Sequence, residues 1–156
     1  MPVSTPQAKL YTLKQLLKRV KKTYESSMSS AQISEAIACV SPPNAATAAV
    51  FSKIMFWLVC TDCPIGCPLV VSSGALPILF ECLRSWPADQ KTMNAACLAL
   101  HWLVVDGSVD VKQAVRDVPD CEQQLRAAQA TGLDKDEEGF SMMARMLRRL
   151  SLYAQC

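Results

Sequence analysis

Three cysteines in the segment CTDCPIGC are the residues of this chain whose type and spacing come nearest to a chemical site. Cys60, Cys63 and Cys67 follow the pattern C-x₂-C-x₃-C. Thiolates at this spacing bind zinc or iron when a fourth ligand completes the site, and Cys60 with Cys63 has the spacing of a redox pair. The sequence has no second C-x₂-C pair, and its single histidine, His101, lies far along the chain. We interpret the segment as a turn between helical units; the alternative is a thiol- or metal-dependent regulator centred on these cysteines.

Other catalytic patterns are missing from the sequence. With one histidine, no Gly-x-Ser-x-Gly turn and no phosphate-binding loop, there is little from which to build a nucleophilic site. The acidic run 134–138 lacks the alternating ligand spacing of a calcium loop. We interpret it as a helix start whose carboxylates are stabilised by the positive end of the helix dipole. We therefore expect a protein that is not an enzyme and holds no cofactor or metal.

The composition indicates one folded domain in a reducing compartment. The chain has 156 residues, of which 51% are hydrophobic and 19% charged, and its net charge of +2 does not indicate a nucleic-acid partner. The N-terminus has no apolar core of a signal peptide, and the uncharged run 63–80 is broken by three prolines, so we expect neither secretion nor a membrane span. We expect a cytoplasmic protein whose cysteines are reduced, with Cys39, Cys82 and Cys97 as small core residues.

Nearly the whole chain has helical periodicity, interrupted by Pro, Gly and Asp clusters. The helices that we expect span 6–25, 29–40, 44–61, 65–72, 75–85, 89–105, 109–117, 120–130 and 137–153. The first of these is amphipathic, and its lysines surround an apolar face. That face consists of Leu10, Leu13, Leu17, Val20 and Tyr24.

An internal repeat relates these helices. Phe56-Trp57-Leu58-Val59 recurs as His101-Trp102-Leu103-Val104, 45 positions later. A weaker third copy places Met143, Met146 and Leu147 at an offset of 43. A period of this length, with a short, a medium and a long helix in each unit, is the size of an armadillo or HEAT repeat.

The segments VVSSGALPILFECLRS and NAACLALHWLV resemble an armadillo unit, with HEAT as the close rival. The residues that match the family pattern are Gly74, Ala75, Leu76, Pro77, Leu79, Leu83, Ala96, Ala99, Leu100 and Leu103. The resemblance is strongest over 65–107. It implies an all-α, right-handed α-solenoid of about three units, at 29–62, 65–107 and, in degenerate form, 109–153. Together with the basic helix 1–25 these units make a single domain, 1–156.

The resemblance also implies a binding surface along the third helices of the units. In the armadillo family an Asn at the position of Trp57 and Trp102 often grips the backbone of an extended peptide. The two tryptophans, and Arg145 in the third unit, predict instead a more apolar groove for a partner helix or peptide. The residues that we predict to contact the partner are Lys53, Phe56, Trp57, Asn94, Leu98, His101, Trp102 and Arg145. The predicted function is a non-catalytic interaction module or adaptor; burial of the tryptophans between units is the alternative.

The two ends of the predicted solenoid differ in charge. The basic helix 1–25 suits a cap that covers the first unit with its apolar face. The alternatives are contact with an anionic membrane surface, as a peripheral scaffold, or with an acidic partner. Arg145, Arg148 and Arg149 give the last helix the polar face of a terminal cap. Because short arrays often pair with another chain, a homo- or hetero-oligomer is a further alternative.

Overall fold

The computed structural model describes residues 5–22, 29–41, 44–61 and 63–154, and these residues form helices and short connections. The helices are α1 (Pro6–Lys22), α2 (Ser30–Val40), α3 (Ala45–Thr61), α4 (Cys63–Ser72), α5 (Ala75–Ser85), α6 (Gln90–Asp106), α7 (Val109–Arg116), α8 (Cys121–Ala130) and α9 (Met142–Ala154). In this part of the chain extended backbone pairs only at an isolated bridge between Lys135 and Ser141. The expected all-α fold class is confirmed.

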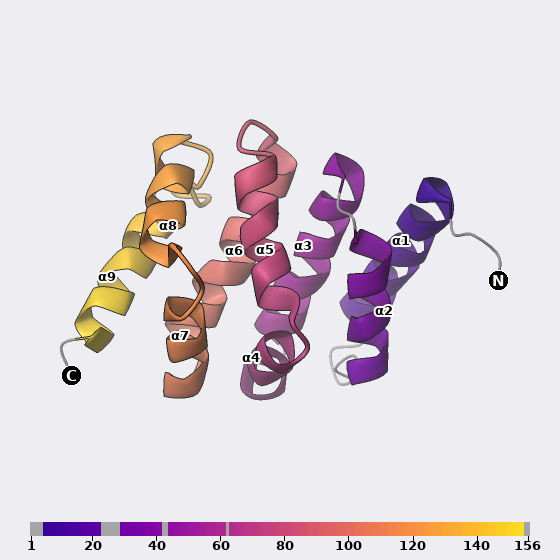
Figure 1. Ribbon diagram of the computed structural model, residues 1–156, viewed down its shortest axis with the longest axis horizontal. Helices are drawn as coiled ribbons and strands as arrows, with labels where there is room; N and C mark the ends of the chain where they lie inside the picture. The colour runs from indigo at the N-terminus through magenta and orange to yellow at the C-terminus, as the bar shows by residue number, and fades with distance from the viewer. Residues whose placement is uncertain (1–4, 23–28, 42–43, 62, 155–156) are drawn as a thin grey trace.

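The helices form two layers (Figure 1). The longer helices α1, α3, α6 and α9 follow one another in one layer, each in contact with the next. Helices α2, α5 and α8 follow one another in the second layer, and the short helices α4 and α7 lie along one edge. The first and last helices are therefore at opposite ends of the array, and α3 and α6 lie side by side.

Helices α3 and α6 have the same length and the same sequence register. Each has 17 residues, and their bounds differ by the 45 residues that separate the two FWLV-type motifs. An acceptor side chain begins each helix: the Asn44 Oδ1 accepts from the Thr47 N–H at 3.0 Å, and the Asp89 carboxylate accepts from the Lys91 N–H at 3.1 Å. Such N-caps satisfy backbone donors that the first turn leaves open. Each cap fixes the first residue of its helix, so both helices begin at matching positions, 45 residues apart.

Helices α4 and α5 meet at a sharp bend. Gly74 lies between them with a φ of 85°, a left-handed conformation that glycine adopts without cost from a Cβ. Among the described residues no single helix is long and apolar enough to cross a membrane. Residues 65–72 and 75–85 reach that length and apolarity only as a pair bent by 77°.

The CTDCPIGC segment contains the junction between α3 and α4, as predicted, but most of its described residues are helical. Helix α3 continues to Thr61 and α4 begins at Cys63, two residues earlier than expected. Pro64 is compatible with this start because the first turn of a helix does not use its N–H groups for intrahelical bonds. Gly66 then lies so close to α3 that a Cβ would be 2.2 Å from the carbonyl oxygen of Leu58. The segment is thus a close helix–helix crossing.

The last helix begins later than predicted. We expected it over 137–153, but α9 starts at Met142. The buried carboxylate of Asp134 holds the loop before it, because its Oδ2 accepts hydrogen bonds from the Met143 N–H at 3.1 Å and the Ser141 hydroxyl at 2.5 Å. The Met143 N–H is one of the donors that the first turn of α9 leaves open, so Asp134 acts on the start of this helix from the preceding loop. The interpretation of the acidic run as the first turn of a helix is therefore wrong.

Helix α1 covers the outer end of the helical array with its apolar face. Leu13, Leu16 and Val20 are buried in the same hydrophobic core as α2 and α3. Leu10 and Leu17, which we also predicted on this face, are half-buried. The predicted continuation of the helix over residues 23–25, with Tyr24, lies outside the described residues.

Candidate partner-binding groove

A groove of about 630 Å³ lies between α3 and α6. Five of the eight predicted contact residues line it, and we call it the α3–α6 groove. Its lining residues are Lys21, Lys53, Phe56, Trp57, Gln90, Lys91, Asn94, Ala95 and Leu98. Its volume falls within the range of roughly 300–1,000 Å³ that is typical of ligand-binding pockets.

Helical spacing explains why these residues meet. Lys53, Phe56 and Trp57 are three and four positions apart in α3, and Asn94 and Leu98 are four apart in α6, so each set lies on one helix face. Both sets are half-buried, and Phe56, Trp57 and Leu98 pack against the core from outside. Because α3 and α6 are neighbours, the two faces form one continuous surface.

Trp57 is held between two neighbours. Its ring meets that of Phe56 edge to face, with centroids 5.8 Å apart. The ammonium of Lys21, from α1, lies 5.7 Å from the Trp57 centroid, a distance at which a cation is attracted to the face of an aromatic ring. Helix α1 thus closes one side of the groove. The prediction of an accessible tryptophan and its alternative, a buried one, are each partly right, because the ring is half-buried.

Four lining residues were not predicted from the sequence: Lys21, Gln90, Lys91 and Ala95. For Lys91 the sequence does carry a signal, because positions 91, 94 and 98 share the helical spacing of one face. Lys21 comes from a different helix, and nothing in its local sequence places it beside Trp57. Only the packing of α1 against α3 brings it there.

The three remaining predicted residues do not form a second groove. His101 is only 7% exposed, so its prediction as an outward-facing contact residue is wrong. Both of its ring nitrogens are buried and have no hydrogen-bond partner among the described residues. Burial and the nearby Arg145 lower the pKa of His101, which keeps the ring neutral at neutral pH. Trp102 is half-buried, with its ring edge to face with His101 at 5.7 Å.

Arg145 is exposed and engaged with the loop before α9. Its guanidinium lies 2.9 Å from the Asp136 carboxylate and 5.5 Å from the centroid of the Phe140 ring. Asp136 also accepts from the Phe140 N–H at 2.9 Å, and this hydrogen bond is the main cause of its lowered pKa. Arg145 is therefore bound to residues of this loop, whereas Lys53 lines the α3–α6 groove.

The three cysteines of CTDCPIGC are divided between α3 and α4. Cys60 is exposed at the end of α3, whereas Cys67 is buried in α4. The side chain of Cys63 lies outside the described residues. The part of the chain that the structure describes contains no group of three His, Cys, Asp or Glu side chains that could hold a metal ion.

Core cysteines have weakly acidic thiols. Burial raises the pKa of Cys82 to about 11 and that of Cys97 to about 12. Because the thiolate is the reactive form, these two thiols are inert at neutral pH. They act as small apolar side chains of the core, as the sequence analysis expected.

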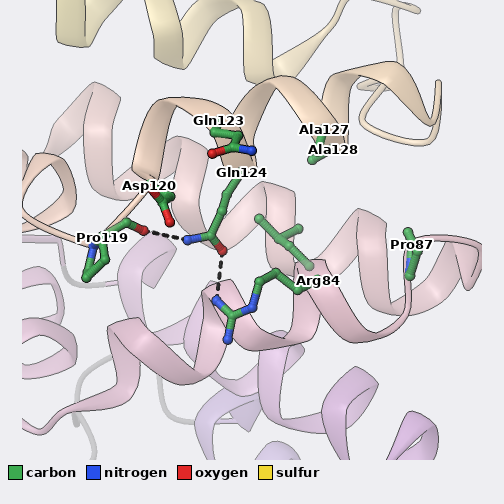
Figure 2. Close-up of a pocket in the computed structure, with 9 residues that line it drawn as sticks. Arg84, Pro87, Pro119, Asp120, Gln123, Gln124, Ala127 and Ala128 are labelled. Carbon is green, nitrogen blue, oxygen red and sulfur yellow. Dashed lines mark hydrogen bonds between the residues drawn. The ribbon is translucent and has the colours of Figure 1, made fainter.

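A second cavity, of about 520 Å³, lies in the other layer between α5 and α8 (Figure 2). Its polar side chains bond to one another across it. Arg84 donates to the Gln124 Oε1 at 2.8 Å, and Gln124 donates in turn to the carbonyl of Pro119 at 2.7 Å. These bonds link the two helices, and the lining of the cavity contains no aromatic side chain of the kind that Phe56 and Trp57 give the α3–α6 groove.

Comparisons of this chain with protein-family models, with curated proteins and with solved structures find no match in any of the three.

Proposed function

We propose that this protein is a non-catalytic interaction module or adaptor, built as an armadillo-like solenoid of about three units, which binds a segment of a partner protein in the α3–α6 groove. The convergence of five predicted contact residues on this groove is the observation that carries the proposal. A concave surface with half-buried aromatic side chains provides the anchoring pockets on which protein interfaces depend.

The layered arrangement supports the solenoid. Helices α3 and α6 repeat at the 45-residue period and pack side by side, and α1 precedes α3 in the same layer. In a solenoid each unit contacts only its neighbours, and an end unit needs a cap with a polar outer face. Helix α1 has the properties of such a cap, because it buries Leu13, Leu16 and Val20 and exposes lysines. Inert core thiols suit a protein of the reducing cytoplasm.

The double variant Phe56→Ala/Leu98→Ala tests the proposed function. It removes two of the three large apolar side chains of the groove, both at half-buried positions, so we expect the fold to be preserved and circular dichroism to be unchanged. A partner is isolated by affinity capture from the source cells, produced separately, and titrated calorimetrically against each variant. We expect its affinity to fall about tenfold or more, the size of effect seen at interface hot spots.

The matched control is Arg84→Ala/Gln124→Ala, which alters the α5–α8 cavity in the other layer. It removes the Arg84–Gln124 hydrogen bond and the bond from Gln124 to the Pro119 carbonyl, both exposed, so it costs little stability. The partner should bind this control as it binds the unaltered protein. Equal binding to the unaltered protein and to the Phe56→Ala/Leu98→Ala variant would refute the groove as the binding site.

A further inference from the structure

We infer that the segment bound in the α3–α6 groove is an acidic peptide segment with apolar anchor residues, an inference that rests on the proposed function. The lining of the groove contains three lysines and no acidic residue. Lys21, Lys53 and Lys91 come from three different helices, α1, α3 and α6. The net charge of the whole chain is only +2, so this cluster of three positive charges is a local property of the groove.

The helix that supplies Lys21 extends the positive charge. Helix α1 contains six basic residues and no acidic residue, and it lies beside α3. Asp89 precedes the lining residue Gln90, but its carboxylate accepts hydrogen bonds from the Lys91 and Thr92 N–H groups and it is not among the lining residues. An approaching acidic segment therefore meets complementary charge, which steers association and selects the partner.

The floor of the groove determines the rest of the partner's chemistry. Phe56, Trp57 and Leu98 are half-buried apolar side chains that only an apolar partner group desolvates favourably. A partner made of acidic residues alone would leave this surface in water. The geometry therefore favours a segment in which Asp or Glu residues alternate with aromatic or leucine side chains, as on an amphipathic helix.

Two other anionic partners fit the structure less well. Single-stranded nucleic acid binds by stacking its bases on aromatic faces, whereas the Trp57 face already lies under Lys21 and its ring packs against Phe56. A membrane surface would require exposed apolar side chains on one face. Of the described large hydrophobic residues that are exposed, Tyr11 lies on α1, Ile65 and Val109 on the neighbouring helices α4 and α7, and Phe140 in the loop before α9.

Selection of a displayed library of random peptides tests the inference. The library is selected against the unaltered protein, against Lys53→Glu/Lys91→Glu, and against Lys135→Glu/Arg148→Glu. The last variant changes the net charge equally at exposed positions outside the groove. We expect the unaltered protein and this control to enrich peptides that combine Asp or Glu with aromatic or leucine residues. These peptides should bind Lys53→Glu/Lys91→Glu roughly tenfold or more weakly, and salt should weaken their binding.

The outcomes separate the inference from the proposed function. In one outcome the enriched peptides need Phe56 and Leu98 but carry no excess of acidic residues, and they bind Lys53→Glu/Lys91→Glu as tightly as the unaltered protein. This result would overturn the acidic partner and leave the groove as a binding site. Absence of any peptide that needs Phe56 and Leu98 would overturn both. A single-stranded oligonucleotide or an anionic phosphatidylserine vesicle that displaces the peptides and needs Lys53 and Lys91 would also overturn the acidic peptide as the partner.

Discussion

His101 is a polar side chain that is buried and has no hydrogen-bond partner among the described residues. At the position equivalent to Phe56 it is buried on α6, near Arg145 and Arg149 of α9 and near Asp136 and Asp106. Burial has the largest effect on its pKa and lowers it from the ordinary value of 6.5; Arg145 and Arg149 act in the same direction, against the two aspartates. The neutral imidazole is therefore the form that the fold accommodates.

We predict that His101→Phe stabilises the protein and reduces its sensitivity to acid. Removing two buried nitrogens that have no described partner should raise the free energy of unfolding by about 1 kcal/mol at neutral pH. Because the folded pKa is lowered, the unfolded state takes up the proton first as the pH falls below 6.5. The contribution of the neutral His101 to stability is thus fully present above that pH and is lost as the pH falls toward the folded pKa.

Urea unfolding at pH values of about 7.5 and 5.5 measures this effect. The stability gap between His101→Phe and the unaltered protein should widen at the lower pH, because titration of the other groups is common to both. A gap that is constant with pH would show that His101 carries no linked proton. A destabilised variant at both values would show that the phenyl ring does not fit the site.

Among the helices, two glycines shape the path of α4 and α5 for different reasons. Gly66 lets α4 approach the backbone of α3, where a Cβ would lie 2.2 Å from the carbonyl oxygen of Leu58. Gly74 has a φ of 85° and nothing within 4 Å of an added Cβ. The first glycine is required by contact between helices and the second by backbone conformation alone.

We predict that alanine at these two positions has unequal costs. Gly66→Ala forces two helix backbones apart and should lower the free energy of unfolding by about 3 kcal/mol or more. Gly74→Ala incurs only the strain of a left-handed residue, about 1 kcal/mol. Chemical denaturation of the two variants beside the unaltered protein measures both costs. Equal losses would contradict the close approach of α4 to α3.

At the scale of the whole molecule, each helix of the long layer is supported by the next. One hydrophobic core runs from Leu13 in α1 to Leu150 in α9. No element spans that distance, so stability must pass from neighbour to neighbour, as in repeat proteins. Helix α1 supports the array from one end only, through its contacts with α2 and α3.

We predict that Leu13→Ala destabilises the array from that end. Leu13 is fully buried, and truncation should cost about 2–5 kcal/mol, whereas Lys14→Ala on the exposed face should change little. Native-state hydrogen exchange should show the greatest loss of protection in α2 and α3 and the least in α9. Uniform loss across all helices would contradict neighbour-by-neighbour coupling. No loss would show that α1 is an appendage and not a cap.

Local sequence was enough to predict the helices whose ends are set by adjacent residues. The bounds of α5 match the prediction at both ends, and the ends of α6 lie within one residue, because Gly74 and the Asp89 cap act on their own neighbours. The 45-residue offset likewise identified α3 and α6 as equivalent helices. It also placed Lys53, Phe56 and Trp57 on one face, since helical spacing is a property of the chain alone.

The neighbour that packs against the outward side of each helix depends on the tertiary structure. Phe56 and His101 are 45 positions apart and match in the two motifs, yet Phe56 lines a groove while His101 is buried on α6, which packs against α9. Lys21 enters the groove from a helix separated in sequence from α3. Periodicity shows which side of a helix is apolar, but the neighbour that meets the other side is set by contacts between residues distant in sequence.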